Sequence, residues 1–512
     1  MSDVLNHSAN RIILCNPRSA SHNHRLPISV LQVGASIYGK HEFVIVDCNL
    51  EKNSWQKLDS YLKTGEFAFF ACSVMPGPQL SEAIKLSKAI RIKYPEIIIV
   101  WGGYFATIQY RICIESALVD YVIRGPGDLS FPELIRCLKD LKSENLPEIA
   151  NLVFKRDGSI VCNPMGPVPD QDTLPNLPLE FLNKFYPVEN YIVKTFLGER
   201  TFSYHSSIGC NYYCGFCGVA RIYHSFWHGK SPTKMYEDLM HLKTEYNINA
   251  IEFHDSNFFG SRKRTLEFCQ LIKGLDIVWW AEGRVDTMNS FSDDELILIR
   301  SSGCCSVFMG AETGNNDLLK KINKGPSSGV NQTLEVVSRF KLYDIIPELS
   351  FVFGFPESSP QRIKLQIQDD IYFARQIKKL NPGAEIVINL YSPVPFDDST
   401  VYKQAQETGL IFPKTLEEWL KPAWRDFDLR LGRSLPWLKP GMIRDIRNFQ
   451  VVLLSAFPGI SNFHLNRVQK GLLKIPGLLR YKLKLYRFPY EIKALLRLFS
   501  YQQPEKEGFY ST

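Results

Sequence analysis

Residues 210–217 read Cys-Asn-Tyr-Tyr-Cys-Gly-Phe-Cys, which places three of the chain's twelve cysteines within eight positions. Thiolates at Cys210, Cys214 and Cys217 can converge from a single loop on a soft metal centre. A structural zinc site normally has four ligands in two separated pairs, and no second pair with suitable spacing follows this stretch. Three cysteines on a four-iron cluster leave one iron open to a substrate or cofactor. The stretch therefore favours a catalytic iron–sulfur cluster over structural zinc or unrelated thiols.

Strand-like and helical stretches alternate around this motif, between residues 194 and 410. The predicted strands are residues 200–207, 250–254, 278–282, 306–310, 348–354 and 385–391. Six such units suit an incomplete α/β barrel, because a complete eight-unit barrel usually needs more residues. Functional groups of such barrels lie at the carboxyl ends of the strands, and the cysteine motif directly follows the first strand.

A second alternation occupies residues 11–141. Its nearly continuous apolar runs are residues 11–17, 42–48, 67–74, 96–103 and 121–125. The clearest helical pattern between them is residues 79–93. This order predicts a Rossmann-like, doubly wound parallel sheet. Ligands of such sheets bind beyond the carboxyl ends of the strands, often where glycines admit them, as at Gly102, Gly103 and Gly125.

A turn signal and a run of prolines separate the two regions. Asp157-Gly158 lies between two short strand-like stretches and predicts a hairpin. Five prolines between residues 164 and 178 predict an extended connector. We therefore expect four parts in the chain. They are a Rossmann-like domain at 1–145, the hairpin and connector at 146–193, the barrel at 194–410, and a mostly helical C-terminal region with a basic tail at 411–512.

The overall composition is that of a globular protein. Hydrophobic residues make up 45% and charged residues 22% of the chain, which excludes a collagenous or wholly disordered protein. No apolar stretch reaches the roughly 18 residues that a membrane-spanning helix needs, and residues 1–10 lack the pattern of a secretory signal. We therefore expect a cytoplasmic protein. Its net charge of +7 comes from residues 467–497, which contain nine basic residues and one acidic residue.

The cysteine motif resembles that of the radical S-adenosylmethionine (SAM) superfamily. In that family the three cysteines hold a [4Fe-4S] cluster, and an aromatic residue, here Phe216, precedes the last of them. The resemblance implies that the open iron binds the amino and carboxylate groups of SAM. It also implies that one electron from the cluster cleaves SAM to a 5′-deoxyadenosyl radical, which abstracts hydrogen from unactivated carbon.

Other stretches along the predicted barrel are similar to the same family. Gly310-Ala311-Glu312-Thr313-Gly314 resembles a Gly-x-Glu-Ser stretch of the family, with Thr replacing Ser. The resemblance implies that Glu312 contacts SAM, with Asp255 and Arg284 as weaker candidates beside Phe216. The alternative for Arg284 is a purely local pair with Asp286 that caps a helix.

The N-terminal region resembles the cobalamin-binding domain of one subgroup. Domains that supply a lower axial ligand contain Asp-x-His-x-x-Gly after the second strand, where this chain has Asp47, Asn49 in place of the histidine, and Lys52 in place of the glycine. The resemblance therefore implies cobalamin without a histidine ligand from this loop. It also implies a pocket for the nucleotide tail, whose candidate residues are Ser73, Gly102, Gly103 and Gly125. The alternative is a Rossmann-like domain that binds no corrinoid.

With both cofactors present, the resemblance implies methylation of an unactivated carbon of a small-molecule or lipid-like substrate. It also implies an external electron donor of the flavodoxin or ferredoxin type. Oxidative cyclisation or rearrangement of a tetrapyrrole-type substrate is the first alternative, and RNA modification is a weaker one. A non-enzymatic iron–sulfur or zinc protein is the rival outside this class.

Leucines interleave with the basic residues of 467–497. This pattern suits peripheral contact with an anionic membrane, or a helical cap with a solvated basic face. Nucleic-acid contact is less favoured, because the C-terminal region has a helical pattern and no β-rich RNA-binding module.

Overall fold

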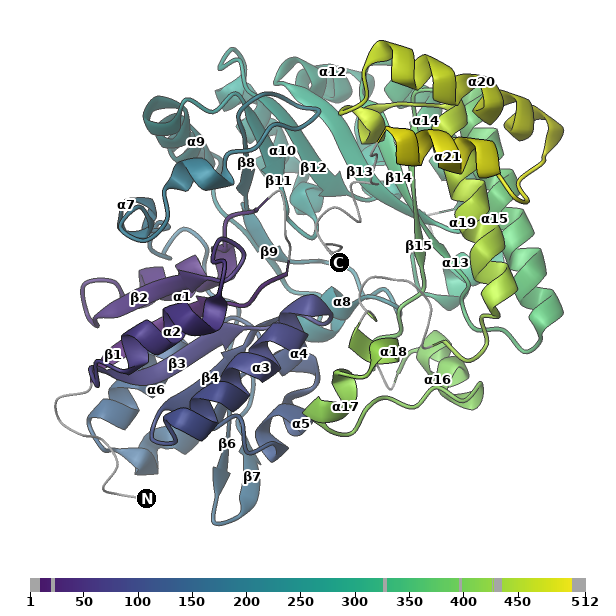
Figure 1. The fold of residues 1–512 in the computed structure, drawn as a ribbon. Coiled ribbons are helices and arrows are strands. Elements are labelled where there is room, and N and C mark those ends of the chain that lie inside the picture. The colour runs from purple at the N-terminus through teal and green to yellow at the C-terminus, as the bar shows by residue number, and fades with distance from the viewer. Residues whose placement is uncertain are drawn as a thin grey trace.

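The computed structural model describes residues 10–19, 24–325, 329–395, 398–425, 427 and 435–499. The N-terminal half is built on a seven-stranded sheet with the order β2-β1-β3-β4-β5-β6-β7 (Figure 1). Its strands are β1 (Arg11–Asn16), β2 (Phe43–Asp47), β3 (Phe67–Ser73), β4 (Ile98–Gly102), β5 (Tyr121–Ile123), β6 (Leu152–Arg156) and β7 (Ser159–Cys162). Strands β1 to β5 are parallel, which confirms the predicted Rossmann-like sheet.

Helices cover both faces of this sheet because its strands are apolar on both sides. The helices of this half are α1 (Ile28–Ile37), α2 (Ser54–Leu62), α3 (Pro78–Lys93), α4 (Gly103–Ile108), α5 (Tyr110–Glu115), α6 (Ser130–Lys139) and the 3₁₀ turn η1 (Ser143–Glu148). Helices α1 and α6 pack on one face, and α2, α3, α4 and α5 pack on the other.

The hairpin of β6 and β7 belongs to this sheet. We expected it in the connector at 146–193, but β6 pairs antiparallel with β5, so the sheet continues past residue 145. The physical reason is that Leu152, Val153 and Phe154 are buried and extend the apolar surface of the sheet. The connector proper then contains α7 (Leu179–Leu182) and the 3₁₀ turn η2 (Val188–Tyr191).

The second half is built on a six-stranded parallel sheet with the order β15-β14-β13-β12-β11-β8. Its strands are β8 (Thr201–Tyr204), β11 (Ala250–Phe253), β12 (Val278–Gly283), β13 (Cys304–Glu312), β14 (Ile346–Phe353) and β15 (Glu385–Leu390). The six strands and their intervening helices confirm the predicted incomplete barrel. The first predicted strand is divided, because β8 is followed by a separate short strand β9 (Ser207–Gly209), which pairs antiparallel with β10 (Trp227–Gly229).

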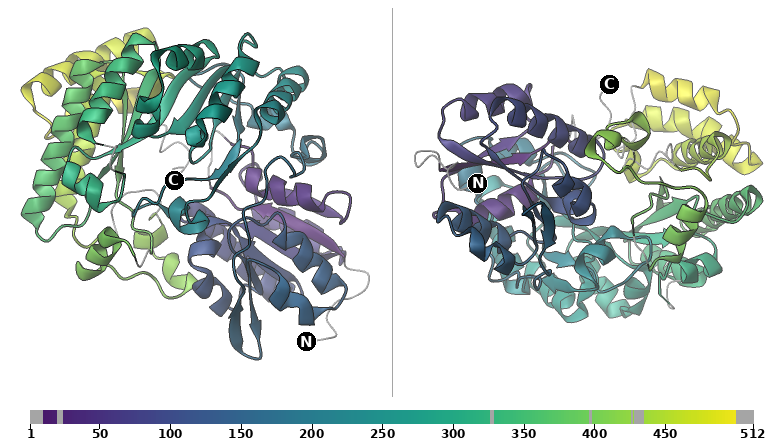
Figure 2. Two further views of the ribbon diagram at one scale, coloured as in Figure 1. Left: turned by 180° about the vertical axis from the view of Figure 1, so that it is seen from behind. Right: turned by 90° about the horizontal axis from the view of Figure 1, so that it is seen from below.

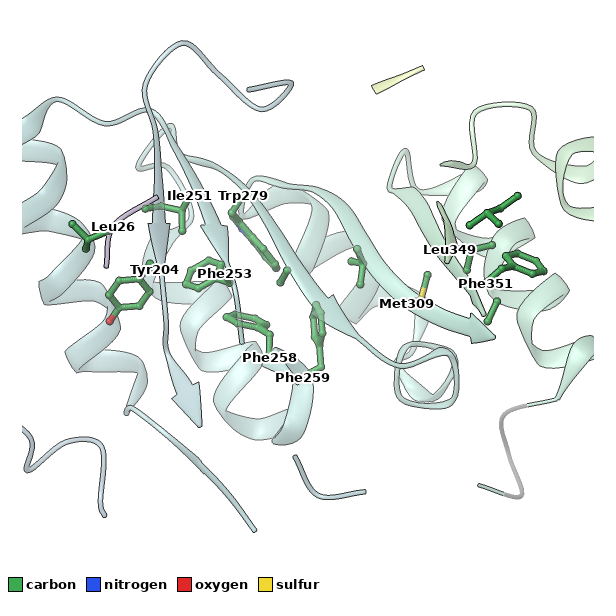
Figure 3. Close-up of a cluster of buried hydrophobic side chains, with 14 of the residues drawn as sticks. Leu26, Tyr204, Ile251, Phe253, Phe258, Phe259, Trp279, Met309, Leu349 and Phe351 are labelled. Carbon is green, nitrogen blue, oxygen red and sulfur yellow. The ribbon is translucent and has the colours of Figure 1, made fainter. Parts of the chain in front are cut away.

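Helices cover the outer face of this open barrel (Figures 1 and 2). They are α9 (Pro232–Tyr246), η3 (Phe258–Gly260), α10 (Arg262–Ile272), α11 (Val285–Ser290), α12 (Asp293–Ser301), α13 (Asn316–Lys321), α14 (Val330–Leu342) and α15 (Pro360–Leu380), whereas the short helix α8 (Gly218–Tyr223) lies between the two halves beside α4 (Figure 1). Figure 3 shows the aromatic centre of this layer, with Phe253, Phe258 and Trp279 gathered on the helix-covered side. Leu26 from the N-terminal half reaches the same cluster.

The C-terminal region is helical in its described part, as predicted. Its helices are α16 (Thr400–Glu407), α17 (Leu416–Trp419), α18 (Pro422–Arg425), α19 (Pro440–Ala456), η4 (Ile460–Asn462), α20 (Arg467–Leu483) and α21 (Tyr490–Leu498). Trp419 packs edge-on against Phe105 of α4, with ring centroids 5.1 Å apart, so α17 ties this region to the N-terminal half. Along the described residues, none of the helices combines the length and the apolar character that crossing a membrane requires.

Candidate functional site

The cysteine motif lies in the loop between β9 and α8. Cys214 is buried, and Cys210 and Cys217 are partly buried. Burial raises the pKa of the Cys210 thiol and raises the pKa of Cys217 to about 11. Within the described ranges, no three or more His, Cys, Asp and Glu side chains are grouped closely enough to hold a metal ion. The assignment of a cluster to these cysteines therefore rests on the spacing, burial and charged surroundings of the thiols.

The segment after α13 holds the cysteine loop in place. The backbone N–H of Gly215 donates to the Ile322 carbonyl at 2.8 Å. The Asn323 amide donates to the Tyr213 carbonyl at 2.7 Å. The Ser399 hydroxyl donates to the Gly215 carbonyl from the other side. These bonds fix the loop backbone through neighbours that are far away in the sequence.

Two buried cations face the cysteine loop. The Arg284 guanidinium lies 3.4 Å from the Cys214 sulfur and 3.5 Å from the centroid of the Tyr212 ring. It also donates to both carboxylate oxygens of Asp286, at 2.9 and 2.8 Å, and to the Lys324 carbonyl. The local pair with Asp286 is confirmed and aims the guanidinium at the cysteine loop, and the contact of Arg284 with SAM stays a prediction.

Lys324 is the second cation, and the sequence analysis did not identify it. Its ammonium group forms an ion pair with Glu312 and lies 5.7 Å from the centroid of the Phe216 ring. Burial alone would lower the pKa of Lys324, but Glu312 and Cys214 offset this and raise it. No local sequence signal marks this lysine, because only the return of the chain after α13 brings it to the site.

Glu312 occupies a constrained position at the end of β13. The residue has a positive φ of 60° and is buried. A side chain at Gly310 would collide with the Glu312 carboxylate and come within 2.5 Å of the Lys324 ammonium, so a larger residue there would displace this buried ion pair. The Thr313 hydroxyl and the Gly314 N–H both donate to Asp370 of α15, at 2.6 and 2.8 Å. The structure thus brings together four of the predicted groups, namely Glu312, Arg284, Phe216 and the cysteine loop.

Asp255 lies in a different network. Its carboxylate accepts from the Ser206 N–H at 2.6 Å, from the Ser206 hydroxyl and from the Ser207 hydroxyl at 2.9 Å. The side chain is fully buried. These bonds fix the link between β8 and β9 that leads into the cysteine loop. The structure therefore gives Asp255 a contact that positions the backbone before the cysteine loop, and its contact with SAM stays a prediction.

The candidate cobalamin residues lie together at the carboxyl end of the N-terminal sheet. Ser73 and Gly102 are partners in the register of β3 and β4. Gly103 has a φ of +86°, and a Cβ atom there would come within 2.6 Å of the Ser73 hydroxyl. The Gly125 N–H donates to the Thr107 hydroxyl at 2.8 Å. This edge is lined mainly by backbone, which fits the close approach of a large nucleotide-bearing cofactor.

The same edge adjoins the cysteine loop. Tyr104 of α4 lies against Gly218, the first residue of α8, so closely that a side chain at Gly218 would collide with the tyrosine ring. Because α8 directly follows Cys217, the glycine-lined edge and the cysteine loop face a common region. The two candidate sites are therefore neighbours in the fold.

The loop after β2 is held by internal bonds. Buried Asp47 accepts from the Asn16 amide at 2.9 Å and from the Tyr191 hydroxyl at 2.9 Å. The Asn49 amide donates to Asp47 at 3.0 Å, and its oxygen accepts from the Ser19 N–H at 2.8 Å. Burial raises the pKa of Asp47. Both ends of the Asn49 side chain are thus engaged within the loop.

An ion pair between Arg25 and Glu252 joins the N-terminal half to strand β11 of the barrel. Arg25, which precedes α1, forms an ion pair of 2.6 Å with Glu252 of β11 and contacts His254. The ring centroids of His254 and Trp280 are 5.4 Å apart. Burial lowers the pKa of the neighbouring His205 to about 4. The sequence analysis missed Arg25 and Glu252, because neither belongs to a recognisable motif.

Comparisons with known proteins agree with this division. The model of the B12 binding domain matches residues 20–135, and the model of the radical SAM superfamily matches residues 204–365. An uncharacterized methyltransferase of Pyrococcus horikoshii is 26% identical over 346 residues, or 67% of this chain and 72% of that protein. The anaerobic magnesium-protoporphyrin IX monomethyl ester cyclase of Synechocystis is 23% identical over 279 residues, or 53% of each chain.

A solved structure shares the fold over most of this chain. It is that of the cobalamin-dependent S-adenosylmethionine radical enzyme OxsB with aqua-cobalamin and S-adenosylmethionine bound. The TM-score is 0.64 at 16% sequence identity, and the match covers 96% of this chain and 75% of the other.

Proposed function

Because this chain is a radical SAM protein with an N-terminal B12-binding domain, we propose that it is a cobalamin-dependent methyltransferase acting on an unactivated carbon. The observation that carries the proposal is the position of the cysteine loop. It lies between the buried group of Arg284, Lys324 and Glu312 on one side and the glycine-lined edge of the N-terminal sheet on the other. One substrate carbon could therefore be reached from both cofactor sites.

When bound, the [4Fe-4S] cluster and SAM supply hydrogen abstraction from carbon, and cobalamin supplies the methyl group. Cys210, Cys214 and Cys217 would hold the cluster. The positive charges of Arg284 and Lys324 would offset the negative charge of three thiolates in a buried place. Glu312 would accept hydrogen bonds from the amino group of SAM, in the position where it now accepts from the Lys324 ammonium.

The Rossmann-like domain would contribute the second cofactor site. Ser73, Gly102, Gly103 and Gly125 would receive the nucleotide tail of cobalamin at the carboxyl end of the sheet. Asn49 stands where a histidine ligand would be, so this loop would give the corrinoid no histidine. The Asn49 side chain is instead hydrogen-bonded to Asp47 and to the Ser19 N–H. Tyr104 and α8 would keep the two cofactor sites at a fixed separation.

The substrate of the proposed reaction is a small or lipid-like molecule, and the electron donor is a flavodoxin or ferredoxin. We propose that the protein acts in the cytoplasm and contacts a membrane surface through residues 467–497. The alternative reaction is oxidative cyclisation, which is favoured by the similarity to a protein named as a cyclase.

Anaerobic reconstitution with iron, sulfide and hydroxocobalamin tests the proposal. We expect about four irons and about one corrinoid per chain, read from metal analysis and absorption spectra. With SAM, substrate and a strong reductant, a methyltransferase should form both 5′-deoxyadenosine and S-adenosylhomocysteine. A cyclase should form 5′-deoxyadenosine alone. One tightly bound zinc ion, or SAM left intact under strong reductant, would rule out both reactions.

A further inference from the structure

Helix α20 exposes an apolar stripe. The residues Val468, Leu472, Ile475, Leu479 and Leu483 follow one another at intervals of three and four positions, so they share one side of the helix. Val468 and Ile475 are 70% and 71% exposed, and the other three are also exposed. An apolar side of this length facing water indicates a contact surface.

The opposite side of α20 is already used for packing. Leu473, Gly477 and Tyr481 are buried, and they lie about half a turn away from the stripe. A Cβ atom at Gly477 would come within 2.5 Å of the backbone nitrogen of Ala456, so α20 is pressed directly onto α19. Helices α20 and α21 form the outer edge of the molecule in all three ribbon views (Figures 1 and 2). The stripe therefore faces outward from the molecule.

A basic groove opens beside the C-terminal end of this stripe. It has a volume of about 1290 Å³ and lies between α15, α19 and the end of α20. Its walls include the apolar side chains of Ile367, Ile371, Met442 and Leu485. Its basic residues are Lys364, Arg375, Lys439, Arg480, Lys484 and Arg487. Asp445 is the acidic residue among the groove's lining residues.

Two of the six cations are used to build the groove. Arg375 donates to the Tyr481 carbonyl and to the Tyr486 hydroxyl, both at 2.6 Å. Arg480 forms an ion pair with Glu491. The other four, Lys364, Lys439, Lys484 and Arg487, form no ion pair within the part of the chain that the structure describes. A groove with apolar walls and surplus positive charge is complementary to an anionic amphiphile.

We propose that α20 lies in the surface of an anionic bilayer and that the groove beside it binds the headgroup of an anionic phospholipid. The stripe enters the boundary between headgroups and acyl chains, as the apolar side of an interfacial helix does. The groove beside the end of the helix then receives the phosphate of a neighbouring headgroup among its cations. This inference deepens the membrane contact proposed above, and it does not depend on the radical chemistry.

Flotation of the full-length protein with lipid vesicles tests the proposal. One set of vesicles is phosphatidylcholine alone, and the other contains equal parts of phosphatidylcholine and phosphatidylglycerol. We expect the protein to float with the anionic vesicles and to remain largely unbound with the neutral ones. The stripe variant carries Ile475→Glu and Leu479→Glu, and it should lose flotation.

The groove variant carries Lys364→Glu on α15 and Lys439→Glu immediately before α19, and it leaves α20 unchanged. It should bind anionic vesicles at least about 30-fold more weakly, because each of the two lysines near an anionic surface contributes about 1 kcal/mol. Its matched control carries Lys85→Glu and Lys88→Glu on the exposed side of α3, with the same change in charge. Leu342→Glu with Ile92→Glu is the control for the stripe, since both side chains are exposed elsewhere. Both controls should float like the unchanged protein.

The proposal is overturned if the unchanged protein ignores anionic vesicles, or if the groove variant binds as its α3 control does. Sedimentation velocity identifies the competing occupant, a second copy of the chain. If the unchanged protein does not float but forms a dimer, and the stripe variant is a monomer, the stripe mediates self-association instead. Circular dichroism and thermal unfolding of each variant show whether it has folded. A failure of the radical chemistry would leave the flotation result unchanged.

Discussion

Arg284 shows how one residue links a local motif to a distant loop. Its pair with Asp286 is separated by two positions and could be expected from the sequence. Its contacts with Cys214 and with the Lys324 carbonyl bridge 70 and 40 positions. The sequence analysis treated the local pair and the cofactor contact as alternatives. The structure contains the local pair together with the contact to the cysteine loop, because the pair holds the guanidinium in the required direction.

Replacing Cys214 with alanine should abolish the cluster and all cleavage of SAM, because two thiolates cannot hold a four-iron cluster with one open iron. Iron analysis after anaerobic reconstitution and the yield of 5′-deoxyadenosine measure the effect. Cys305→Ala is the matched control, since this partly buried thiol lies on β13 outside the motif. It should retain the iron content and SAM cleavage of the unchanged protein. Normal iron in the Cys214 variant would contradict the ligand assignment.

Replacing Asn49 with alanine should change cobalamin retention little. The amide is bonded to Asp47 and Ser19, so its loss should lower the free energy of unfolding by about 1–2 kcal/mol without removing a ligand. Corrinoid absorbance after gel filtration measures retention. Gly103→Ala is the comparison, because its Cβ atom would collide with the Ser73 hydroxyl and the Val74 backbone, and the resulting shift of the glycine-lined edge should reduce retention clearly. A large loss of corrinoid in the Asn49 variant would show that this side chain contacts the cofactor.

At the scale of elements, side-chain bonds divide the first barrel strand. Residues 200–207 were predicted as one strand, but β8 ends at Tyr204 and β9 begins at Ser207. The Ser206 N–H donates to the Asp255 carboxylate instead of continuing the ladder with β11. This change of partner turns the chain toward β10 and the cysteine loop. Apolar periodicity could not predict it, because the partner lies 49 positions away.

The end of β13 is tied to α15 through Asp370, which makes stability depend on pH. Burial raises the pKa of Asp370 to about 7 from its ordinary value of 3.8. The folded protein therefore binds this proton more tightly than the unfolded chain does. The contribution of Asp370 to the free energy of unfolding is therefore fully present below pH 3.8, and it is lost as the pH rises toward 7. Asp370→Asn cannot ionise and should not show this loss.

Thermal unfolding of the two proteins from pH 5 to pH 8 measures the difference at Asp370. The asparagine variant should gain stability relative to the unchanged protein by at most about 1.4 kcal/mol per pH unit below pH 7, and the difference should level off above it. Asp369→Asn removes an exposed neighbouring negative charge that helps to raise the pKa of Asp370, so the stability of this variant should fall less with rising pH than that of the unchanged protein. Parallel profiles for the Asp370 variant and the unchanged protein would mean that Asp370 does not titrate in this range.

At the scale of the whole molecule, the two halves share one apolar core and several polar ties. Leu26 of the N-terminal half joins the cluster that contains Phe253 and Trp279 of the barrel (Figure 3). Tyr186 and Tyr191 of the connector donate to Glu51 and Asp47 of the N-terminal half, at 2.6 and 2.9 Å. The proline-rich connector therefore packs against the domain that it follows. These ties keep the glycine-lined edge next to the cysteine loop.

Replacing Tyr191 with phenylalanine should lower the free energy of unfolding by about 1–3 kcal/mol, because the buried Asp47 carboxylate loses one donor. Burial raises the pKa of the Tyr191 hydroxyl, so it remains a donor at neutral pH. Denaturant unfolding measures the change. Tyr38→Phe is the control, since Tyr38 is 52% exposed and should show almost no effect. Equal stability of the two variants would mean that the connector tie contributes nothing.

The pattern of residues along the sequence was enough to predict the two α/β regions, the cysteine loop and the helical C-terminal region. Apolar periodicity and motif spacing depend only on neighbouring residues, so they can be recognised without a structure. Tertiary packing alone decided that the β6–β7 hairpin joins the first sheet, that Lys324 meets Glu312, and that α15, α19 and α20 enclose a basic groove. The residues that meet in these features lie far apart along the chain or in separate elements. Such contacts depend on how whole helices and strands pack against one another, and a pattern among neighbouring residues cannot predict that packing.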